Sequence, residues 1–341
     1  MVVILKDELA VAIAVVGTMV GAGFASGQEL VQFFVMLGSE APAAVMLMGT
    51  LLILAASQVR RLALKWRTNS YRDFLVVLLG KWEKPADMVT GAFLFGGLAI
   101  MLAGSGAVVK EHFGLAPLTG IIACGVLAFL ASLGKGHGFL LLNALMVPVM
   151  MVIIIVAALI AVFSQPGPFH VSPPASPGGL ISSNWILNAC LYVTYNMAGV
   201  AVLLTSLPAS RKGVLGAGVG GLFLGGLAYL LVKALRGLSP AGLQAELPLL
   251  YLVSGLQPGL VHLYALALWL AAVTTAASNL YGLATRLGQI PALPTWRAAL
   301  LMLILALPVA TCGFINLVSW IYPFFGYIGL FLLLLALVCR L

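Results

Sequence analysis

The chain has 341 residues, of which 62% are hydrophobic and only 8% are charged. This composition excludes a soluble globular protein, because the chain repeatedly reaches the roughly 20 apolar residues that cross a bilayer as a helix. Seventeen basic residues against 9 acidic ones give a net charge of +8. The basic residues lie in short segments between apolar runs, which indicates membrane orientation rather than nucleic-acid binding.

The sequence predicts an all-α polytopic membrane protein, a single transmembrane domain covering residues 1–341. Ten spans are expected, with bounds uncertain by about 2–4 residues: 9–37, 42–63, 86–109, 115–133, 138–163, 184–207, 213–235, 259–285, 297–316 and 319–339. If the N-terminus is cytoplasmic, only Lys110, Lys233 and Arg236 of the 17 basic residues fall outside, and the other fourteen, Arg340 included, fall inside. The positive-inside rule therefore predicts a protein of the cell membrane with both termini in the cytoplasm.

The first span contains a polar, glycine-rich interruption at residues 16–29 (Val-Gly-Thr-Met-Val-Gly-Ala-Gly-Phe-Ala-Ser-Gly-Gln-Glu). Unpaired backbone groups cost several kcal/mol in lipid, so such a break is tolerated only where it lines a cavity or binds a ligand. A half-helix that starts after Gly21, Ala22 and Gly23 would aim its amide donors at a carboxylate. The carbonyls before the break would suit sodium or an ammonium group. Close helix packing is the alternative explanation for these glycines.

Glu29 is the only carboxylate placed well inside a span, which makes it a candidate coupling or gate residue. One interpretation is that Glu29 carries the protons that drive transport. The other is that Glu29 is a packing residue near the outer end of the span, paired with Lys110, Lys233 or Arg236.

A proline-rich segment, residues 164–183, carries no lysine or arginine and divides the chain into halves of five spans. Because five is odd, the second half is expected to lie inverted relative to the first, as in many secondary transporters. Repeat one covers about residues 7–163 and repeat two about 184–340. The sixth span has polar residues and a glycine, Tyr195, Asn196 and Gly199, in the matching position, which predicts a second helix break.

The polar segment 236–258 is expected to form a short external helix or lid between the seventh and eighth spans. The eighth span itself carries a run of hydroxyls at residues 271–279, including Thr274 and Thr275. Hydroxyl oxygens suit sodium, although such side chains often only bond to the carbonyl one turn earlier.

Residues 216–221 match the nucleotide-binding pattern GxGxxG, but they lie inside an apolar span and read as a helix-packing face. Protease and esterase motifs are missing from the sequence, and the four cysteines have no metal-ligand spacing. Neither an enzyme nor a bound cofactor is expected.

Residues 21–29 (Gly-Ala-Gly-Phe-Ala-Ser-Gly-Gln-Glu), together with Tyr195 and Asn196, resemble the amino acid–polyamine–organocation superfamily. Within it, the Ala-Ser-Gly-Gln-Glu continuation resembles the YkvI-like bacterial membrane proteins. The resemblance implies a LeuT-type fold over nearly the whole chain, with ten helices in two inverted repeats and the first and sixth helices broken.

The resemblance also implies ligand positions. Sodium-coupled members hold the ion between the first and eighth spans, which corresponds here to Gly17, Val20, Ala271, Thr274 and Thr275. The fifth span lacks the lysine that some proton-coupled relatives place there, which favours sodium. The substrate positions that match are Gly21, Ala22, Gly23, Ser105, Tyr195, Asn196 and Gly199.

These observations predict a secondary-active symporter that moves a small carboxylate-bearing solute, an amino acid or a related compound, driven by sodium. Two alternatives remain: a proton-coupled transporter that uses Glu29, and a sensor or receptor subunit that binds a solute without transporting it.

Overall fold

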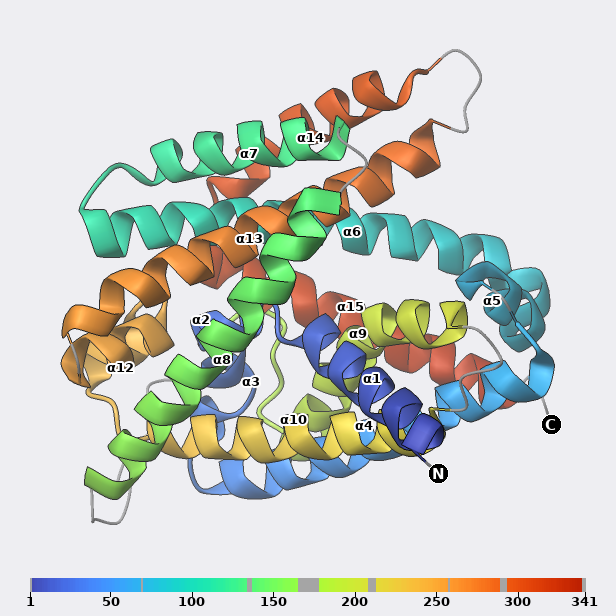
Figure 1. Cartoon of the computed structure of the whole chain (residues 1–341), viewed down its shortest axis with the longest axis horizontal. Helices are drawn as coiled ribbons and strands as arrows, with labels where there is room; N and C mark the ends of the chain where they lie inside the picture. The colour runs from blue at the N-terminus through green and yellow to red at the C-terminus, as the bar shows by residue number, and fades with distance from the viewer. Residues whose placement is uncertain are drawn as a thin grey trace.

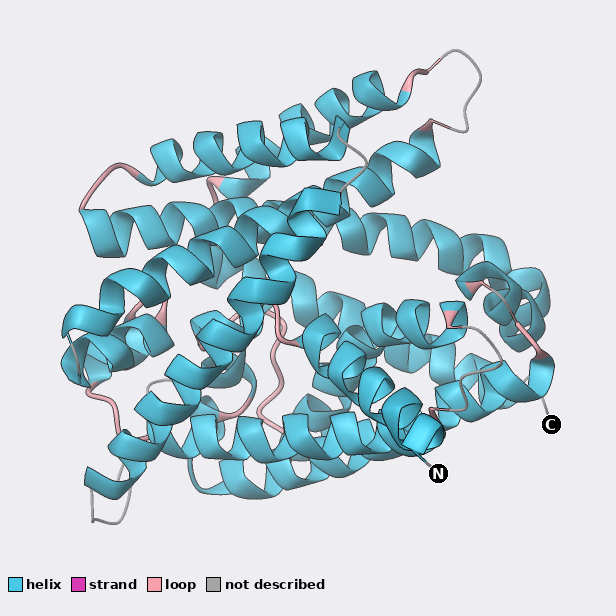
Figure 2. Ribbon diagram, viewed as in Figure 1, coloured by secondary structure: helices cyan, strands magenta, loops and turns pink. Residues whose placement is uncertain are grey.

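A computed structural model gives the structure of residues 2–68, 70–133, 137–164, 178–207, 213–256, 258–288 and 293–338. Within these residues every regular element is a helix (Figures 1 and 2). The helices are α1 (Val2–Met19), α2 (Ala22–Ser26), α3 (Gln28–Phe33), η1 (Val35–Glu40), α4 (Ala41–Trp66), α5 (Tyr71–Leu79), η2 (Gly80–Trp82), α6 (Glu83–Phe113), α7 (Pro117–Leu133), α8 (His137–Ser164), α9 (Trp185–Ser206), α10 (Val214–Leu235), α11 (Pro240–Gln244), α12 (Pro248–Leu256), α13 (Pro258–Leu287), α14 (Thr295–Ala310) and α15 (Phe314–Val338).

Eight of the ten predicted spans each coincide with one helix. The first is divided among α1, α2, α3 and η1, and the ninth, residues 297–316, runs past the end of α14 into the start of α15. By length and composition, six helical stretches of the described residues can cross a membrane: Val35–Trp66, Tyr71–Phe113, Trp185–Ser206, Val214–Leu235, Gly259–Leu287 and Phe314–Leu335. The protein is therefore a multi-pass membrane protein. The proline-rich segment lies mostly outside the described residues, as do Arg340 and the side chain of every residue from 137 to 147.

Two groups of helices pack side by side (Figure 1). The α4 group consists of α1, α4, α9 and α10, and the α6 group of α6, α7, α13 and α14. Two further helices connect the groups: α8 contacts both α10 and α13, while α15 contacts both α9 and α6. The short helix α2 contacts α6 and α13, so the interrupted first span lies between the two groups.

In residues 236–258, where one short helix or lid was expected, the structure has two short helices, α11 and α12. Figure 1 places α12 at the opposite end of the molecule from the N-terminus. Helix α5 was not predicted. A local signal for it exists: the side chain of Ser70 accepts a hydrogen bond of 3.1 Å from the N–H of Asp73, which caps the first turn.

The prediction of a broken sixth span is wrong, because α9 runs as one helix from Trp185 to Ser206. The side chain of Asn196 bonds to its own helix instead of interrupting it. The amide of Asn196 donates to the carbonyl of Tyr192 at 2.9 Å, one turn earlier. Gly199 alone is not enough to end a helix whose remaining residues all accept helical geometry.

Candidate functional site

The first span is interrupted between α1 and α2 by a change in backbone hydrogen bonding. The N–H of Val20 donates to Val16 at 2.8 Å, but the N–H of Gly21 turns to the carbonyl of Met19 at 2.9 Å. In a continuous helix the N–H of Gly21 would bond to Gly17. The carbonyl of Gly17 therefore loses its helical donor at the position where carbonyl oxygens were predicted to serve as ligands.

A second turn follows at Gly27, whose φ of +82° lies in the left-handed region that glycine adopts without strain. The hydroxyl of Ser26 supports this turn: it donates to the carbonyl of Gly23 at 2.6 Å and accepts from the N–H of Gln28 at 3.1 Å. The turn starts α3 in a new direction and brings Glu29, in the first turn of α3, back over Gly23.

A cavity of about 410 Å³ lies at the interruption, and we call it the break cavity. It is bounded by α1 and α2, by α6 and α13 from the α6 group, and by α9 and α15. The lining residues are Gly17, Thr18, Met19, Val20, Gly21, Ala22, Gly23, Phe24, Glu29, Phe93, Leu94, Gly97, Met101, Tyr195, Asn196, Gly199, Thr274, Thr275, Ser278, Asn279 and Tyr322.

Most of the predicted substrate residues line this cavity: Gly21, Ala22, Gly23, Tyr195, Asn196 and Gly199. Ser105 does not. It is fully buried, and its hydroxyl donates to the carbonyl of Gly120 at 2.9 Å, which joins α6 to α7. The structure therefore places Ser105 at a helix contact, away from the break cavity.

The predicted sodium ligands also meet here, since Gly17, Val20, Thr274 and Thr275 all line the break cavity. Ala271 is buried one turn away, and its carbonyl accepts the hydroxyl of Thr274 at 3.0 Å. That bond uses the hydroxyl hydrogen of Thr274. Carbonyl and hydroxyl oxygens are hard ligands, so this donor set fits sodium.

Glu29 is buried beside three tyrosines, of which only Tyr195 was predicted from the sequence to belong to the site. Its Oε2 accepts a hydrogen bond of 2.7 Å from the hydroxyl of Tyr195, and its Oε1 occupies the place where a Cβ of Gly23 would lie. The ring of Tyr322 stacks on that of Tyr195, with centroids 4.7 Å apart and planes within 6°. The hydroxyl of Tyr192, also buried, has no hydrogen-bond partner among the described residues.

The predicted pairing of Glu29 with an outer basic residue is not seen among the described residues. Lys110 instead binds Oε1 of Glu246 at 2.7 Å. The participation of Tyr322 was missed because it lies in the tenth predicted span, remote in sequence from the interruption. Its one local signal is a hydroxyl-bearing ring directly before Pro323 in an apolar segment.

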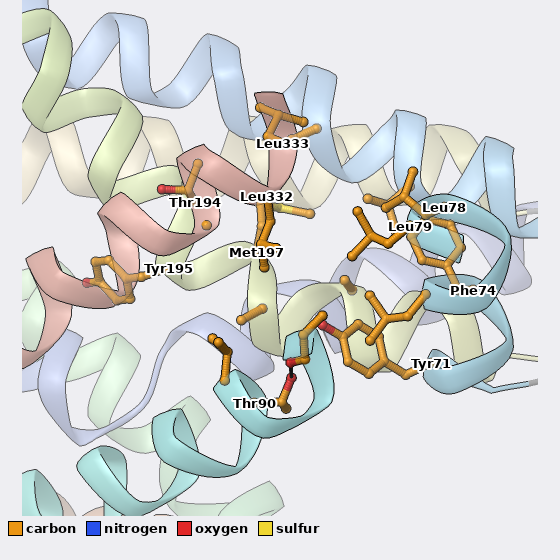
Figure 3. A pocket seen from close by; sticks show the side chains of 18 of the residues that line it. Tyr71, Phe74, Leu78, Leu79, Thr90, Thr194, Tyr195, Met197, Leu332 and Leu333 are labelled. Carbon is orange, nitrogen blue, oxygen red and sulfur yellow. Dashed lines mark hydrogen bonds between the residues drawn. The ribbon is translucent and has the colours of Figure 1, made fainter. Parts of the chain in front are cut away.

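A second, apolar cavity of about 310 Å³ lies beside the first, between α4, α5, α6, α9 and α15. Figure 3 shows Tyr195 at one end of it and Phe74, Leu78 and Leu79 of α5 at the other. Phe93 and Tyr195 line both cavities. These two aromatic side chains therefore separate a polar chamber at the interruption from an apolar one under α5.

Two curated proteins of Bacillus subtilis (strain 168) are similar over almost the whole chain. YyaD, an uncharacterized protein, is 28% identical over 324 residues, which cover 94% of this chain and 93% of YyaD. The uncharacterized membrane protein YkvI is 26% identical over 323 residues, covering 92% and 91% respectively. No protein-family model matches the chain.

Solved structures of transporters share its fold at low sequence identity. The inward-facing conformation of Mhp1 has a TM-score of 0.69 at 13% identity and covers 95% of this chain and 73% of Mhp1. A manganese transporter of Eremococcus coleocola has a TM-score of 0.62 at 16% identity, covering 98% and 78%. The expected resemblance is confirmed: the chain has the LeuT-type fold and is similar to the YkvI-like membrane proteins.

Proposed function

We propose that the chain is a secondary-active transporter that moves a small solute, an amino acid or a related compound, through the break cavity by alternating access. The observation that carries this proposal is a polar cavity at a helix interruption that is open toward one end of the molecule and sealed toward the other. A binding site that faces one side at a time is what alternating access requires.

The cavity reaches the surface on the side away from α12, at the last turn of α1 and in the C-terminal half of α13. Gly17, Thr18 and Ser278 are exposed lining residues, whereas Ala22, Gly23 and Phe24 are buried. Figure 1 shows the N-terminus and α5 at this end of the molecule. With the predicted topology, the open side is the cytoplasmic side.

The opposite side is closed by direct contacts. The hydroxyl of Tyr264 on α13 donates to the carbonyl of Ala25 on α2, and Leu249 of α12 packs on Gly27. Phe33 and Phe34 pack around the ring of Tyr192, with centroids 5.5 and 5.1 Å from it. A solute in the break cavity has no path through these contacts, so release to the other side needs a conformational change.

The proposed topology is ten spans in two inverted repeats, with both termini in the cytoplasm and the protein in the cell membrane. Support comes from the match between predicted spans and helices, and from the fourteen-to-three division of basic residues. The proposed coupling ion is sodium, held by Gly17, Val20, Ala271, Thr274 and Thr275. Bound there, sodium would supply positive charge between α1 and α13 and join the two helix groups.

Purified protein in liposomes tests this function. We expect counterflow of at least one radiolabelled amino acid, and accumulation when a sodium gradient is imposed. Thr274→Ala and Thr275→Ala should each raise the sodium concentration for half-maximal uptake roughly tenfold, which corresponds to about 1.4 kcal/mol of lost binding. Thr285→Ala, which removes a back-bonding hydroxyl from the same helix, is the control and should leave this value unchanged.

Other outcomes of the same assay identify the alternatives. Accumulation that is driven only by a pH gradient, and that is lost in Glu29→Gln, would identify protons and not sodium as the coupling ion. Binding without counterflow would identify the protein as a sensor or receptor and not a transporter. Because one structural neighbour is a manganese transporter, Mn²⁺ belongs in the panel, and uptake of this ion alone would overturn the organic substrate class.

A further inference from the structure

We propose that the break cavity recognises its solute through a cationic amino group, which the carboxylate of Glu29 and the rings of Tyr195 and Tyr322 hold. This inference deepens the proposed function and rests on it for the statement that the bound solute is transported. It assigns to Glu29 the role of ligand for the substrate, in place of a gate or packing residue.

Among the residues that the structure describes, Glu29 has no positively charged partner. Its side chain is buried, and no lysine, arginine or histidine of the described residues forms an ion pair with it. Elsewhere among the described residues, Arg72 pairs with Glu83, Lys110 with Glu246, and Arg286 with Asp87. A buried carboxylate is costly unless a positive group or several hydrogen bonds compensate it.

The carboxylate of Glu29 is accessible to a solute in the break cavity. Glu29, Tyr195 and Tyr322 all line the break cavity of about 410 Å³, which has room for a small organic cation beside them. The missing side chain of Gly23 is what admits Oε1 of Glu29, since a Cβ there would overlap it. The hydroxyl of Tyr195 holds Oε2 at 2.7 Å, so the carboxylate is fixed at the cavity wall.

Aromatic rings lie around the carboxylate of Glu29. Tyr195 and Tyr322 are stacked, and Tyr192 meets Tyr195 edge-on with centroids 5.3 Å apart. Aromatic faces attract ammonium groups, an effect that grows when the cation is desolvated. A carboxylate with tyrosines is a set of groups that selects a cation and disfavours an anion.

The negative charge of Glu29 would also orient a zwitterionic solute in the cavity. A solute carboxylate beside Glu29 would experience like-charge repulsion inside a low-dielectric site. The cavity wall is also lined by Thr275, whose hydroxyl lies 4.0 Å from where a Cβ of Gly21 would be. An amino acid is therefore expected to bind with its amino group at Glu29 and its carboxylate toward α13.

Matched sets of compounds test the proposal by thermal unfolding of the purified protein in detergent with sodium. Each set holds an amino acid, the amine that lacks its carboxylate and the acid that lacks its amino group: L-alanine, ethylamine and propionate; L-leucine, isoamylamine and 4-methylpentanoate; L-phenylalanine, phenethylamine and 3-phenylpropionate. In at least one set, the amine and the amino acid should raise the Tm by roughly 2–4 °C near saturation, and the acid should not.

Variants separate recognition from folding. Glu29→Gln keeps the shape of the side chain and should weaken amine binding at least roughly tenfold, whereas Glu40→Gln, at an exposed carboxylate, should bind as the wild type does. Tyr322→Leu should weaken binding, and Tyr322→Phe, which keeps the ring face, should restore it. If Glu29→Gln does not fold, the comparison of Tyr322→Leu with Tyr322→Phe still tests whether the aromatic ring binds the amine.

The results separate this inference from the transport function. Stabilisation by the acids alone, by MnCl₂ alone or by none of the compounds would overturn the amine proposal. Amine-dependent stabilisation without counterflow would leave it standing and overturn transport. Counterflow of an acid that lacks an amino group would leave the transport function standing and overturn the amine proposal.

Discussion

At the residue scale, the sequence position of a charge does not reveal what the charge does. Arg60 was counted among the cytoplasmic loop charges, yet its side chain is 1% exposed. Its Nη1 donates to the carbonyls of Leu204 at 2.9 Å and Leu207 at 3.1 Å, at the C-terminal end of α9. Carbonyls in the last turn of a helix lack intrahelical donors, and a cation there interacts favourably with the helix dipole.

We predict that Arg60→Gln destabilises the protein by about 2–3 kcal/mol, the contribution of hydrogen bonds from a charged donor to buried carbonyls. The Tm in detergent should fall accordingly. Arg61→Gln is the matched control because Arg61 is exposed, and its Tm should stay at the wild-type value. Equal melting temperatures for the two variants would contradict a capping role for Arg60.

The residues of the candidate site were partly predictable from the sequence. Glu29 stood out because a carboxylate inside an apolar span needs a reason. Its neighbours could not be inferred, because Tyr322 comes from α15, nearly 300 residues away along the chain. Ser105 shows the opposite case: a hydroxyl in a span looked available, but only the packing of α6 on α7 reveals that it bonds to Gly120.

At the scale of elements, the glycines of α10 form a packing face, as the sequence analysis favoured over nucleotide binding. A Cβ at Gly225 would lie 2.8 Å from the Cα of Gly49 on α4, and one at Gly221 would lie 2.9 Å from the backbone nitrogen of Ile53. A Cβ at Gly220 would lie 3.0 Å from the carbonyl oxygen of Ala12 on α1. Small residues allow backbones to approach this closely in membrane helices.

We predict that Gly225→Leu separates α10 from α4 and destabilises the protein by about 1–3 kcal/mol, the cost of overpacking a tight contact. The neighbouring Gly226 is an internal control, because no atom lies within 4 Å of its expected Cβ and the residue is exposed. Gly226→Leu should keep the wild-type Tm and elute as one species in size-exclusion chromatography, while Gly225→Leu should melt earlier. A normal Tm for both variants would show that the glycine face is not required.

The elements themselves were predicted in proportion to the strength of their local signals. Residues 21–23 read Gly-Ala-Gly and the span is interrupted there, whereas the lone Gly199 left α9 continuous. Helix α5 was missed because its nine residues are too few for a span and its start depends on one capping contact at Ser70. Apolar length predicts spans reliably, but a break or a short helix depends on which hydrogen bonds tertiary contacts permit.

At the scale of the whole molecule, α12 is the element that seals the side opposite the opening. Leu249 is fully buried, and a Cβ at Gly27 would lie 2.7 Å from its Cγ. A cavity of about 10 Å³ lies between this seal and the break cavity, lined in part by Ser26, Val108 and Leu247. In a conformation open to this side, α12 must move away from α2 and α3, so the contact of Leu249 stabilises the conformation seen here.

We therefore predict that Leu249→Ala shifts the protein toward a conformation open on the α12 side. Loss of a buried leucine costs about 2 kcal/mol or more, which changes a two-state ratio roughly 30-fold, and only the sealed conformation bears this cost. The reporter is Val108→Cys in a background where the four native cysteines are replaced by alanine. Leu249→Ala should speed its labelling by a membrane-impermeant thiol reagent added on the α12 side. Leu260→Ala, at an exposed leucine of α13, should not. Unchanged labelling in Leu249→Ala would mean that another element, and not α12, holds the sealed side shut.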